Sequence, residues 1–598
     1  MTETPSDRDG VLRVGAFSGF YGDSPDNMSI LLQDGVDVLI GDYLAELTML
    51  ILRKNEMRGA PGYARTFVTQ LRDNLPRIAA SGVKVVANAG GLDPEGCANE
   101  IRAVIESLGL DLTVAAIVGD DLTEELAGNL GKTAELANID TGEVLDLGQH
   151  EIMTANAYLG AWPIVEALHA GADIVVCPRM TDASLVVGPA AWHFGWEATA
   201  WDQLAGAVVA GHVIECGGQA SGGNYSHFHQ YEDLGYPGLP IAEIRPDGSS
   251  VITKVGDSGG VVTVDTIKAQ LFYEIGGAEY QNPDVVTHLT SLTLTDLGGH
   301  RVEIGSVKGS RPTSTTKLAL TYEGGFRNSM TIGLTGGHVA EKAAWLRRQV
   351  EGRVGGPDYF DGFRMTVIGP AREVDGTYDE ATALVTFNVR DRDVKKVSRQ
   401  AFSDKIVQLC LASIPGFYMT TPPQKERLYG VQWPCLIDKS VLHPIVRIAG
   451  VEDREVEWPD FSDINETPRP EPAAPDTDIP DGPARRVTLG SVAATRSGDK
   501  GGKANVGVWG RSAGAYAWLR SYLTVERFAE LVPEAHGLRV ERHEFPNLLG
   551  LNFLVYGWLE DGVSSCLRID AQAKGVGEYL ASKTVDVPQG LLGDPDKM

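Results

Sequence analysis

The amino-acid sequence predicts an α/β fold with three parts: a mostly parallel, Rossmann-like layered domain, an α+β lobe that continues from it, and a small C-terminal ferredoxin-like α/β sandwich. Three observations lead to this prediction. Short apolar runs alternate with amphipathic segments in the first part of the chain. The composition then shifts to Thr, Val and turn residues, and an acidic, Pro-rich segment separates the C-terminal part.

Five apolar runs predict the strands of the first domain. The runs are "LRVGAF" (12–17), "VDVLIGDY" (36–43), "KVVANAGG" (84–91), "LTVAAIVGDD" (112–121) and "ADIVVCPRMTDAS" (172–184). Segments of helical period such as 44–55 and 94–109 lie between them. Because the runs are apolar throughout, both faces of each strand should be covered, which is typical of a parallel sheet between helix layers. The apolar run 204–214 also looks strand-like.

Domain boundaries follow from composition. We expect a disordered N-terminus over 1–11 and a main domain over 12–451, with its α/β part at 12–234 and its α+β part at 235–451. Period-two strands and hairpin turns dominate the second part, with helices expected at 338–351 and 400–413. The acidic, Pro-rich stretch 452–485 predicts a linker. Residues 486–590 predict the ferredoxin-like domain, with helices near 526–531 and 570–582.

Composition limits the classes of function. The chain has 598 residues, 43% of them hydrophobic, so a sizeable core is expected. With 80 acidic and 52 basic residues the net charge is −28, which opposes binding to nucleic acid or an anionic membrane. Six scattered cysteines without a CxxC pair, and no leader-like or membrane-spanning run, indicate a cytoplasmic protein. Its size and acidity favour a homo-oligomer.

Polar residues follow nearly every predicted strand of the first domain. Ligands of such sheets bind beyond the carboxyl ends of the strands, so a shared cleft is expected there. The residues are Ser18, Tyr21, Asp42, Tyr43, Asn88, Asp120, Asp121, Arg179, Thr181 and Asp182. The alternative for each Asp, Asn, Ser or Thr is a helix N-cap, which contributes about 1 kcal/mol.

Several stretches together resemble the acyclic terpene utilization family of the AtuA type. They are "GAFSGFYGDSP", "DVLIGDYLAELTMLIL", "VANAGGLDP", "VVCPRMTDASLVVGPAAWHFGW", "GHVIECGGQASGGN" and "QLFYEIGGAEYQNPDV". The C-terminal "ATRSGDKGGKANVG" is similar to the ferredoxin-fold domain that accompanies that family's main domain. The resemblance implies the degradation of branched, isoprenoid-like acids as coenzyme A thioesters. It also implies pathway partners such as an acyl-CoA carboxylase or hydratase.

Two strand ends carry the strongest candidates for catalysis. Arg179 can hold a carboxylate or phosphate, and Asp182 can act as a general base or orient Arg179. Asp42 and Glu46 lie four residues apart, and two neighbouring carboxyl groups allow acid/base work at neutral pH because one pKa rises. We predict Asp42, Asp182, Arg179 and Cys216 as catalytic residues, although Cys216 has no base nearby in sequence. Helix capping is the conservative role for Asp182.

Glycine-rich loops supply the remaining candidates for substrate binding. In "IECGGQASGGNYSHF" (214–228) bare amides could cradle an anion, whereas the alternative is a tight structural loop. "RSGDKGGKANVG" (496–507) is basic but lacks P-loop spacing, so it predicts an anionic ligand or an interdomain salt-bridge loop. The predicted binding residues are Tyr43, Glu46, Asn88, Gly90, Thr181, Gly217, Gly218, Gln219, Gly222, Gly223, Asn224, Arg496, Ser497, Asp499, Lys500 and Asn505.

Three functions remain open at this stage. The first is an enzyme that hydrates, dehydrates or cleaves a branched acyl-CoA, with coenzyme A as part of the substrate and no separate cofactor. The second is a non-catalytic assembly subunit for an acyl-CoA carboxylase pathway. The third is a metal-dependent hydrolase, for which His227 and His229, placed on one side of a strand near Asp42, would hold a divalent metal. "GDSGG" (256–260) does not indicate a serine protease, because the α/β first half contradicts that architecture.

Overall fold

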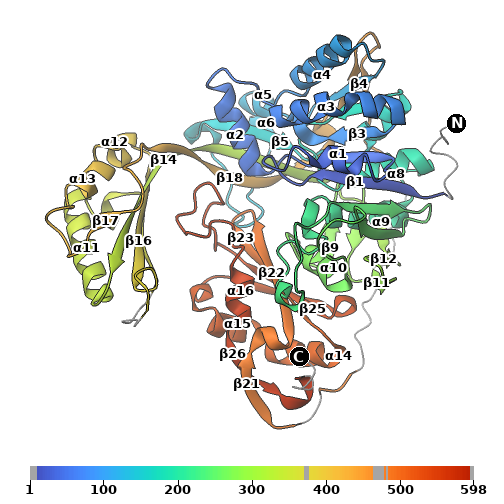
Figure 1. Cartoon of the computed structure of the whole chain (residues 1–598). Coiled ribbons are helices and arrows are strands. Elements are labelled where there is room, and N and C mark those ends of the chain that lie inside the picture. Colours follow the sequence, from blue (N-terminus) through green and yellow to red (C-terminus); the bar gives the residue numbers. More distant parts are fainter. Residues whose placement is uncertain (1–9, 370–375, 462–476, 480–481, 593–598) are drawn as a thin grey trace.

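The computed structural model describes residues 10–369, 376–461, 477–479 and 482–592 (Figure 1). The predicted disordered N-terminus lies outside these ranges except for its last two residues, and so do residues 462–476 and 480–481, half of the predicted linker. The mixed α/β fold class predicted from the sequence is confirmed. Within the described residues, no helix combines the length and the apolar character needed to cross a membrane.

A large mixed sheet forms the centre of the main domain. Its five central strands, β1, β2, β3, β6 and β4, are parallel, and the strands added at both edges are antiparallel. In spatial order the strands are β11 (Thr293–Asp296), β12 (Val302–Gly305), β8 (Ser250–Lys254), β7 (Pro240–Ile244), β1 (Leu12–Ser18), β2 (Val38–Gly41), β3 (Lys84–Ala87), β6 (Ile174–Val176), β4 (Val114–Val118), β19 (Ile445–Ile448) and β20 (Arg454–Glu455).

Helices cover both faces of this sheet, as continuous apolarity predicts. One core contains Leu39 and Val85 with residues of α1, α3 and α4, and the other contains Val38 and Val86 with residues of α7, α8 and α9. The helix bounds are α1 (Asn27–Leu31), α2 (Glu46–Glu56), α3 (Arg65–Ser81), α4 (Pro94–Leu108), α5 (Thr123–Ala127), α6 (Leu130–Thr133), α7 (Trp162–His169), α8 (Ser184–Phe194) and α9 (Trp201–Ile214).

Two local predictions of strand structure are wrong. The apolar run 204–214 is the core of helix α9, in which every residue from Leu204 to Ile214 is buried. A helix that is enclosed on all sides is apolar all round, so it has no polar stripe to reveal its period. The segment after 261 forms helix α10 (Val264–Leu271), whose Thr263 and Thr266 make a capping box.

The second part of the main domain is divided between two sheets. Strands β7, β8, β11 and β12 extend the central sheet, whereas 315–438 supplies most of a second sheet that projects from the body (Figure 1). Its 21-residue strand β14 pairs with β5 and β18 near the body and with β16 farther out. The bounds are β5 (Ile152–Ala157), β14 (Thr315–Thr335), β15 (Gly362–Ile368), β16 (Thr382–Asp391), β17 (Tyr418–Met419) and β18 (Arg427–Asp438).

Helices α11 and α13 pack on the projecting part of this sheet with their own apolar core. Helix α11 (Val339–Val354) matches the predicted helix at 338–351. The predicted helix at 400–413 is shorter, because only α13 (Ser403–Val407) is helical and turns follow it. Helix α12 (Val394–Val397) precedes it.

The C-terminal domain is a four-stranded antiparallel sheet with helices, in the order β22-β23-β25-β24. A short pair, β21 and β26, stands beside it. The bounds are β21 (Ala484–Thr488), β22 (Ala493–Lys500), β23 (Lys503–Gly510), α14 (Ala513–Tyr522), α15 (Val525–Leu531), β24 (Val540–Phe545), β25 (Gly550–Val555), α16 (Val576–Ala581) and β26 (Thr584–Pro588).

The C-terminal sheet packs against α10 and the segment after it. The Phe272 ring stacks on Trp509 with centroids 5.6 Å apart, and Trp509 Nε1 donates to Asp265 Oδ1 at 3.1 Å. Glu274 N donates to Asn505 Oδ1 at 2.8 Å. Gly507 allows this approach, because a Cβ at that position would lie 2.4 Å from Phe272 Cβ. The hairpin β22–β23 is thereby fixed against the main domain.

Gly507→Ala should weaken this domain contact. The added methyl overlaps Phe272, and overpacking of this kind costs about 1–3 kcal/mol. Thermal unfolding should show a lower midpoint. Gly352→Ala is the matched control: Gly352 lies exposed in α11 with open space at its Cβ position, so the same change should be neutral or stabilising. Equal effects of the two changes would contradict this account.

Candidate active site

Asp42 lies at the carboxyl end of β2, held by a neighbouring strand end. Asn88 Nδ2 donates to Asp42 Oδ1 at 2.6 Å, and Asn88 Oδ1 accepts from Tyr43 N at 2.7 Å. Burial raises the pKa of Asp42 well above its ordinary value and nearby Asp182 raises it further, while Arg179 and Asn88 oppose the shift only in part. Asp42 therefore remains a protonated acid at a pH where an exposed aspartate is ionised.

Arg179, just beyond β6, binds two side chains. Its Nη1 donates to Asp182 Oδ1 at 2.6 Å and its Nη2 to Tyr158 Oη at 2.8 Å, with the guanidinium 4.1 Å from the centre of the Tyr158 ring. Burial lowers the pKa of Arg179, but Asp182, Tyr158 and Glu46 raise it well above its ordinary value, so the group stays charged. Its buried Nε has no hydrogen-bond partner among the described residues.

Tyr158 connects Arg179 to a second ion pair. Tyr158 Oη donates to Glu46 Oε1 at 2.8 Å. Glu46 Oε1 also accepts from Lys317 Nζ at 2.6 Å. Burial raises the pKa of Glu46, but Lys317 and Arg179 more than offset this and hold it well below its ordinary value. Glu46 is thus an anion that fixes two donors, whereas Asp42 is a neutral acid.

A second buried acid follows helix α9. Glu215 Oε1 lies 3.1 Å from His212 Nδ1, and its buried Oε2 has no hydrogen-bond partner among the described residues. Burial raises the pKa of Glu215 well above its ordinary value, and Asp182 and Glu274 add to this. The next residue, Cys216, has its pKa raised by burial and by Glu215, Glu274 and Asp42. A thiol in this field stays protonated, which disfavours a thiolate nucleophile.

The C-terminal domain contributes two further charges. At the end of β22, burial raises the pKa of Asp499 to about 7, with Glu274 and Glu46 adding to the shift. Lys500 Nζ lies 5.7 Å from the centre of the Tyr280 ring and interacts through space with Glu215 and His212. These contacts place the β22–β23 hairpin at the cluster formed by Asp42, Arg179 and Glu215.

The charged groups of this cluster border accessible space. The side chains of Glu46, Asp182 and Lys317 retain 25%, 26% and 26% of their surface, although protein surrounds them closely enough for burial to act on the pKa of Glu46 and Lys317. We call the solvent-accessible space that these three side chains border the recess. We call the set Asp42, Glu46, Tyr158, Arg179, Asp182, Glu215, Lys317 and Lys500 the acid–base cluster.

Not every predicted residue reaches the acid–base cluster. The Tyr43 ring lies in the apolar core, 5.7 Å from Phe67, and only its backbone touches Asn88. Thr181 Oγ1 is hydrogen-bonded to Ser184 Oγ at the start of α8, whose N-cap residue is Ala183, so Thr181 is not the N-cap that was its alternative. Gly90 brings β3 close to β6, where a Cβ would lie 2.7 Å from Cys177 O.

The glycine loop 214–228 meets neighbouring backbone. The amides of Gly222 and Gly223 donate to Gln219 O and Gly218 O within the turn, so they have no N–H free for an anion. A Cβ at Gly218 would lie 3.3 Å from Pro237 O, whereas at Gly217, whose φ is +61°, the nearest atom is Asp23 Oδ2 at 3.6 Å. The tight packing of this loop matches the structural alternative.

The same loop receives Arg496 from the C-terminal domain. Arg496 Nη2 donates to Gln219 Oε1, Nη1 donates to Asn224 O at 3.4 Å, and the guanidinium lies 4.3 Å from the centre of the Tyr273 ring. Two other predicted residues are anchors: Ser497 Oγ accepts from Gly577 N, and Asn505 binds Glu274 N. The motif at 496–507 therefore combines an interdomain contact with one member of the acid–base cluster, Lys500, and its neighbour Asp499.

The residues predicted to bind metal are placed differently from the prediction. His229 lies in a 3₁₀ turn (Phe228–Gln230), and His227 is the residue just before that turn, so neither is in a strand. His227 Nε2 contacts Gly490 O at 3.0 Å. Among the residues that the structure describes, no three His, Cys, Asp or Glu side chains are grouped to hold a metal ion. We therefore propose no metal site.

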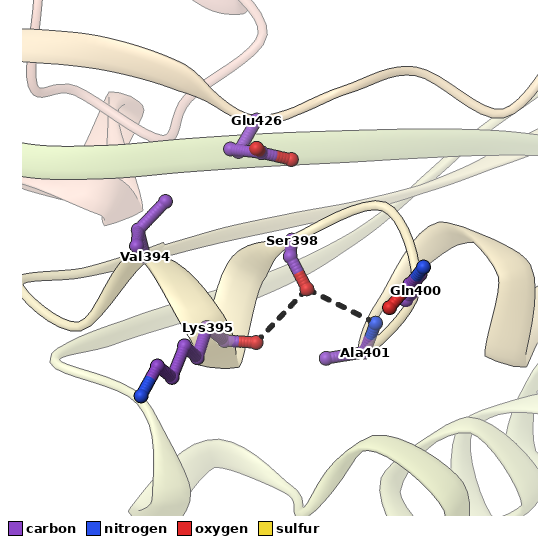
Figure 2. Close-up of a pocket in the computed structure, with 6 residues that line it drawn as sticks. All are labelled: Val394, Lys395, Ser398, Gln400, Ala401 and Glu426. Carbon is purple, nitrogen blue, oxygen red and sulfur yellow. Dashed lines mark hydrogen bonds between the residues drawn. The ribbon is translucent and has the colours of Figure 1, made fainter.

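A surface hollow of about 440 Å³ lies in the projecting lobe, apart from the cluster (Figure 2). Its wall includes Lys395, Ser398 and Glu426, and Ser398 Oγ donates to Lys395 O at 3.0 Å in a turn. It shares no residue with the acid–base cluster and contains no buried charge. We assign no function to it.

Sequence reasoning missed Tyr158, Lys317 and Glu215. Tyr158 and Lys317 follow from the pairing of β5 with β14, two strands far apart in the chain, and no local pattern marks them. Glu215 carried a signal, because it is an acidic residue directly after eleven consecutive buried residues of a helix.

Asp120 should make stability depend on pH. Its Oδ2 accepts from Asn156 Nδ2 at 2.8 Å and Arg179 N at 3.2 Å, and burial, with Asp121, raises its pKa to about 7. The folded state therefore holds this proton more tightly than the unfolded state. The resulting stability is complete below about pH 4 and is lost as pH rises through about 7, by up to about 4 kcal/mol.

Asp120→Asn cannot titrate at this position. Denaturant unfolding from pH 4 to 8 should show the wild type losing stability relative to this variant as pH rises. Parallel curves for the two proteins would contradict the shift.

Comparison with known families assigns the chain. Residues 12–448 match the acyclic terpene utilisation family protein AtuA, and residues 487–586 match the AtuA ferredoxin-like domain. No curated protein matches the sequence. Because the first match covers most of the chain, this protein belongs to the acyclic terpene utilisation (AtuA) family and ends in that family's ferredoxin-like domain.

Proposed function

We propose that this protein is a catabolic enzyme that hydrates or dehydrates a branched, isoprenoid-like acyl-CoA thioester. The single observation that supports this proposal most is that the acid–base cluster holds a protonated carboxyl group next to an ionised one. Asp42 is a neutral acid next to the charged pair of Arg179 and Asp182. Where the environment makes the pKa values of two carboxyl groups differ in this way, one group can donate a proton and the other can accept it.

The free-energy cost of burying the charges of the acid–base cluster favours a catalytic role over a scaffold role. Each buried ion costs several kcal/mol before its partners offset that cost, and polar atoms without partners add to it. Arg179 Nε and Glu215 Oε2 are two such atoms. A subunit that only assembles a carboxylase would gain nothing from them, whereas perturbed groups of this kind concentrate at functional sites.

The proposed reaction uses the carboxyl groups of Asp42 and Asp182. In dehydration, Asp182 removes the proton next to the thioester carbonyl, and Asp42 protonates the hydroxyl group, which leaves as water; hydration is the reverse. Arg179 holds Asp182 Oδ1, which leaves Oδ2 for the proton, and we propose that its guanidinium binds the thioester carbonyl oxygen equally before and during the chemical step. Cleavage of the carbon–carbon bond in a 3-hydroxyacyl thioester would use the same pair, with the base acting on the hydroxyl group.

The substrate class rests on the family and on chemistry. The family name supports a branched acyclic acid. We propose a thioester because it acidifies the neighbouring carbon enough for a carboxylate base to act. Coenzyme A then belongs to the substrate, and the reactions that supply and consume it are those of an acyl-CoA carboxylase pathway.

Asp42→Asn should abolish most turnover without unfolding the protein. The amide cannot donate the proton, and loss of a general acid or base costs about 10²- to 10⁴-fold in rate. Since Asp42 is neutral in the folded protein, the amide should change the unfolding midpoint little. The assay follows consumption of a 3-methyl-branched enoyl-CoA and, in parallel, cleavage of 3-hydroxy-3-methylglutaryl-CoA.

Asp121→Asn is the control for this change, because Asp121 is an exposed strand-end residue that caps Thr123. It should retain full turnover. A wild-type protein that consumes neither thioester, yet co-purifies with carboxylase subunits, would instead be the assembly subunit.

Arg179→Lys should weaken substrate binding more than it slows the chemical step. A lysine cannot replace a fork that reaches Asp182, Tyr158 and the substrate together. Steady-state kinetics should show KM raised at least about tenfold, as for loss of one charged hydrogen bond. Arg327→Lys is the control, because Arg327 contacts Ser564 O at the lobe, away from the cluster. An unchanged KM would contradict this role.

A further inference from the structure

Lys500 differs from the other lysines around the recess. Lys317 is paired with Glu46, Lys503 with Asp140, and Lys574 Nζ donates to Tyr273 Oη at 2.9 Å. The side chain of Lys500 makes no hydrogen bond or ion pair with a described residue, and its Nζ lies 5.7 Å from the centre of the Tyr280 ring. The amine is therefore not committed to any structural partner.

The charges around Lys500 make its neutral form accessible. Burial lowers its pKa, and Lys317 and Lys503 lower it further, while Glu274 and Glu46 oppose the shift. Burial and a nearby cation are the two features that activate lysine amines as nucleophiles. Glu215, the neutral acid with an unpartnered Oε2, interacts with the same amine.

We infer that Lys500, carried into the recess by the C-terminal domain, forms an imine with a ketone or aldehyde. The inference rests on its lack of a partner, on its position 5.7 Å from the Tyr280 ring, and on the electrostatic interaction of its amine with the neutral acid Glu215. It gives the protein an activity toward carbonyl compounds that the proposed action on thioesters does not require. It also makes the C-terminal domain part of the active site.

The reaction balances with groups already present. The amine nitrogen of Lys500 adds to the carbonyl carbon, and Glu215 donates a proton to the carbonyl oxygen. The resulting carboxylate takes a proton from nitrogen to complete the carbinolamine. The same carboxyl then protonates the hydroxyl group, which leaves as water while the carbon–nitrogen double bond forms as an iminium ion. The Glu215 carboxylate finally takes the remaining proton from nitrogen, which leaves the neutral imine and restores the acid. One amine and one carbonyl thus give one imine and one water, with no oxidant or reductant.

Reductive trapping tests this inference on the full-length protein. The protein is incubated with 4-methyl-2-pentanone and cyanoborohydride at neutral pH, digested, and mapped by mass spectrometry. We expect the added hydrocarbon on Lys500 at a rate at least about tenfold above that of the exposed Lys132 and Lys395, because a lowered pKa leaves a larger fraction of the Lys500 amine as free base. Labelling should saturate with ketone concentration.

Variants separate binding from covalent capture. Lys500→Arg retains the charge and should abolish the label at this position, whereas Lys574→Met should leave it unchanged. Labelling of Lys500 no faster than that of Lys132 would overturn the inference, and this comparison needs only the wild type. The result is independent of thioester turnover, so failure here and failure of the proposed function can be told apart.

Discussion

The acid–base cluster is governed by the cost of removing ionised groups from water. Arg179 meets this cost with three elements of structure: Asp182 at the start of α8, Tyr158 after β5, and Glu46 at the start of α2 acting through Tyr158. Loss of Asp182, the carboxylate bonded directly to the guanidinium, would leave the buried charge poorly compensated, which costs about 3–5 kcal/mol. The carboxyl ends of the parallel strands, the second sheet and the helices beside them are therefore held in one arrangement by one guanidinium group.

The C-terminal domain extends this constraint across the chain. Its sheet packs on Phe272, and the contacts of Asn505 and Arg496 fix the segments before and after the hairpin turn. The turn itself then has little freedom, so Asp499 and Lys500 are presented to the recess at fixed positions. Glycines at 507 and 550 make this possible, because a side chain at either would collide with Phe272. Apolar packing outside the recess thus positions the charges inside it.

Sequence reasoning reached the part of the cluster that obeys a local rule. Asp42, Asn88, Arg179 and Asp182 follow apolar strands, and parallel strands bring their carboxyl ends to one edge. Lys317 and Tyr158 meet through a pairing of distant antiparallel strands, which no local period encodes. The glycines of 214–228 predicted that another group lies close to the loop backbone, and neighbouring protein backbone does so. The residue type alone does not show whether that group is a ligand or protein backbone. The prediction of a strand at 204–214 is wrong because helix α9 is buried on all sides, so its sequence lacks the alternation of apolar and polar residues that marks a helix.

One electrostatic environment gives different outcomes for different groups in the recess. Burial favours the neutral form of every side chain, so it raises the pKa of the Cys216 thiol and the Glu215 carboxyl and lowers that of the Lys500 amine. A neutral thiol is a poor nucleophile, a neutral carboxyl is a proton donor, and a neutral amine is a nucleophile. Desolvation alone therefore disfavours cysteine chemistry here while it enables acid catalysis and amine addition. Groups with tight partners, such as Arg179, Glu46 and Lys317, remain ionised against it.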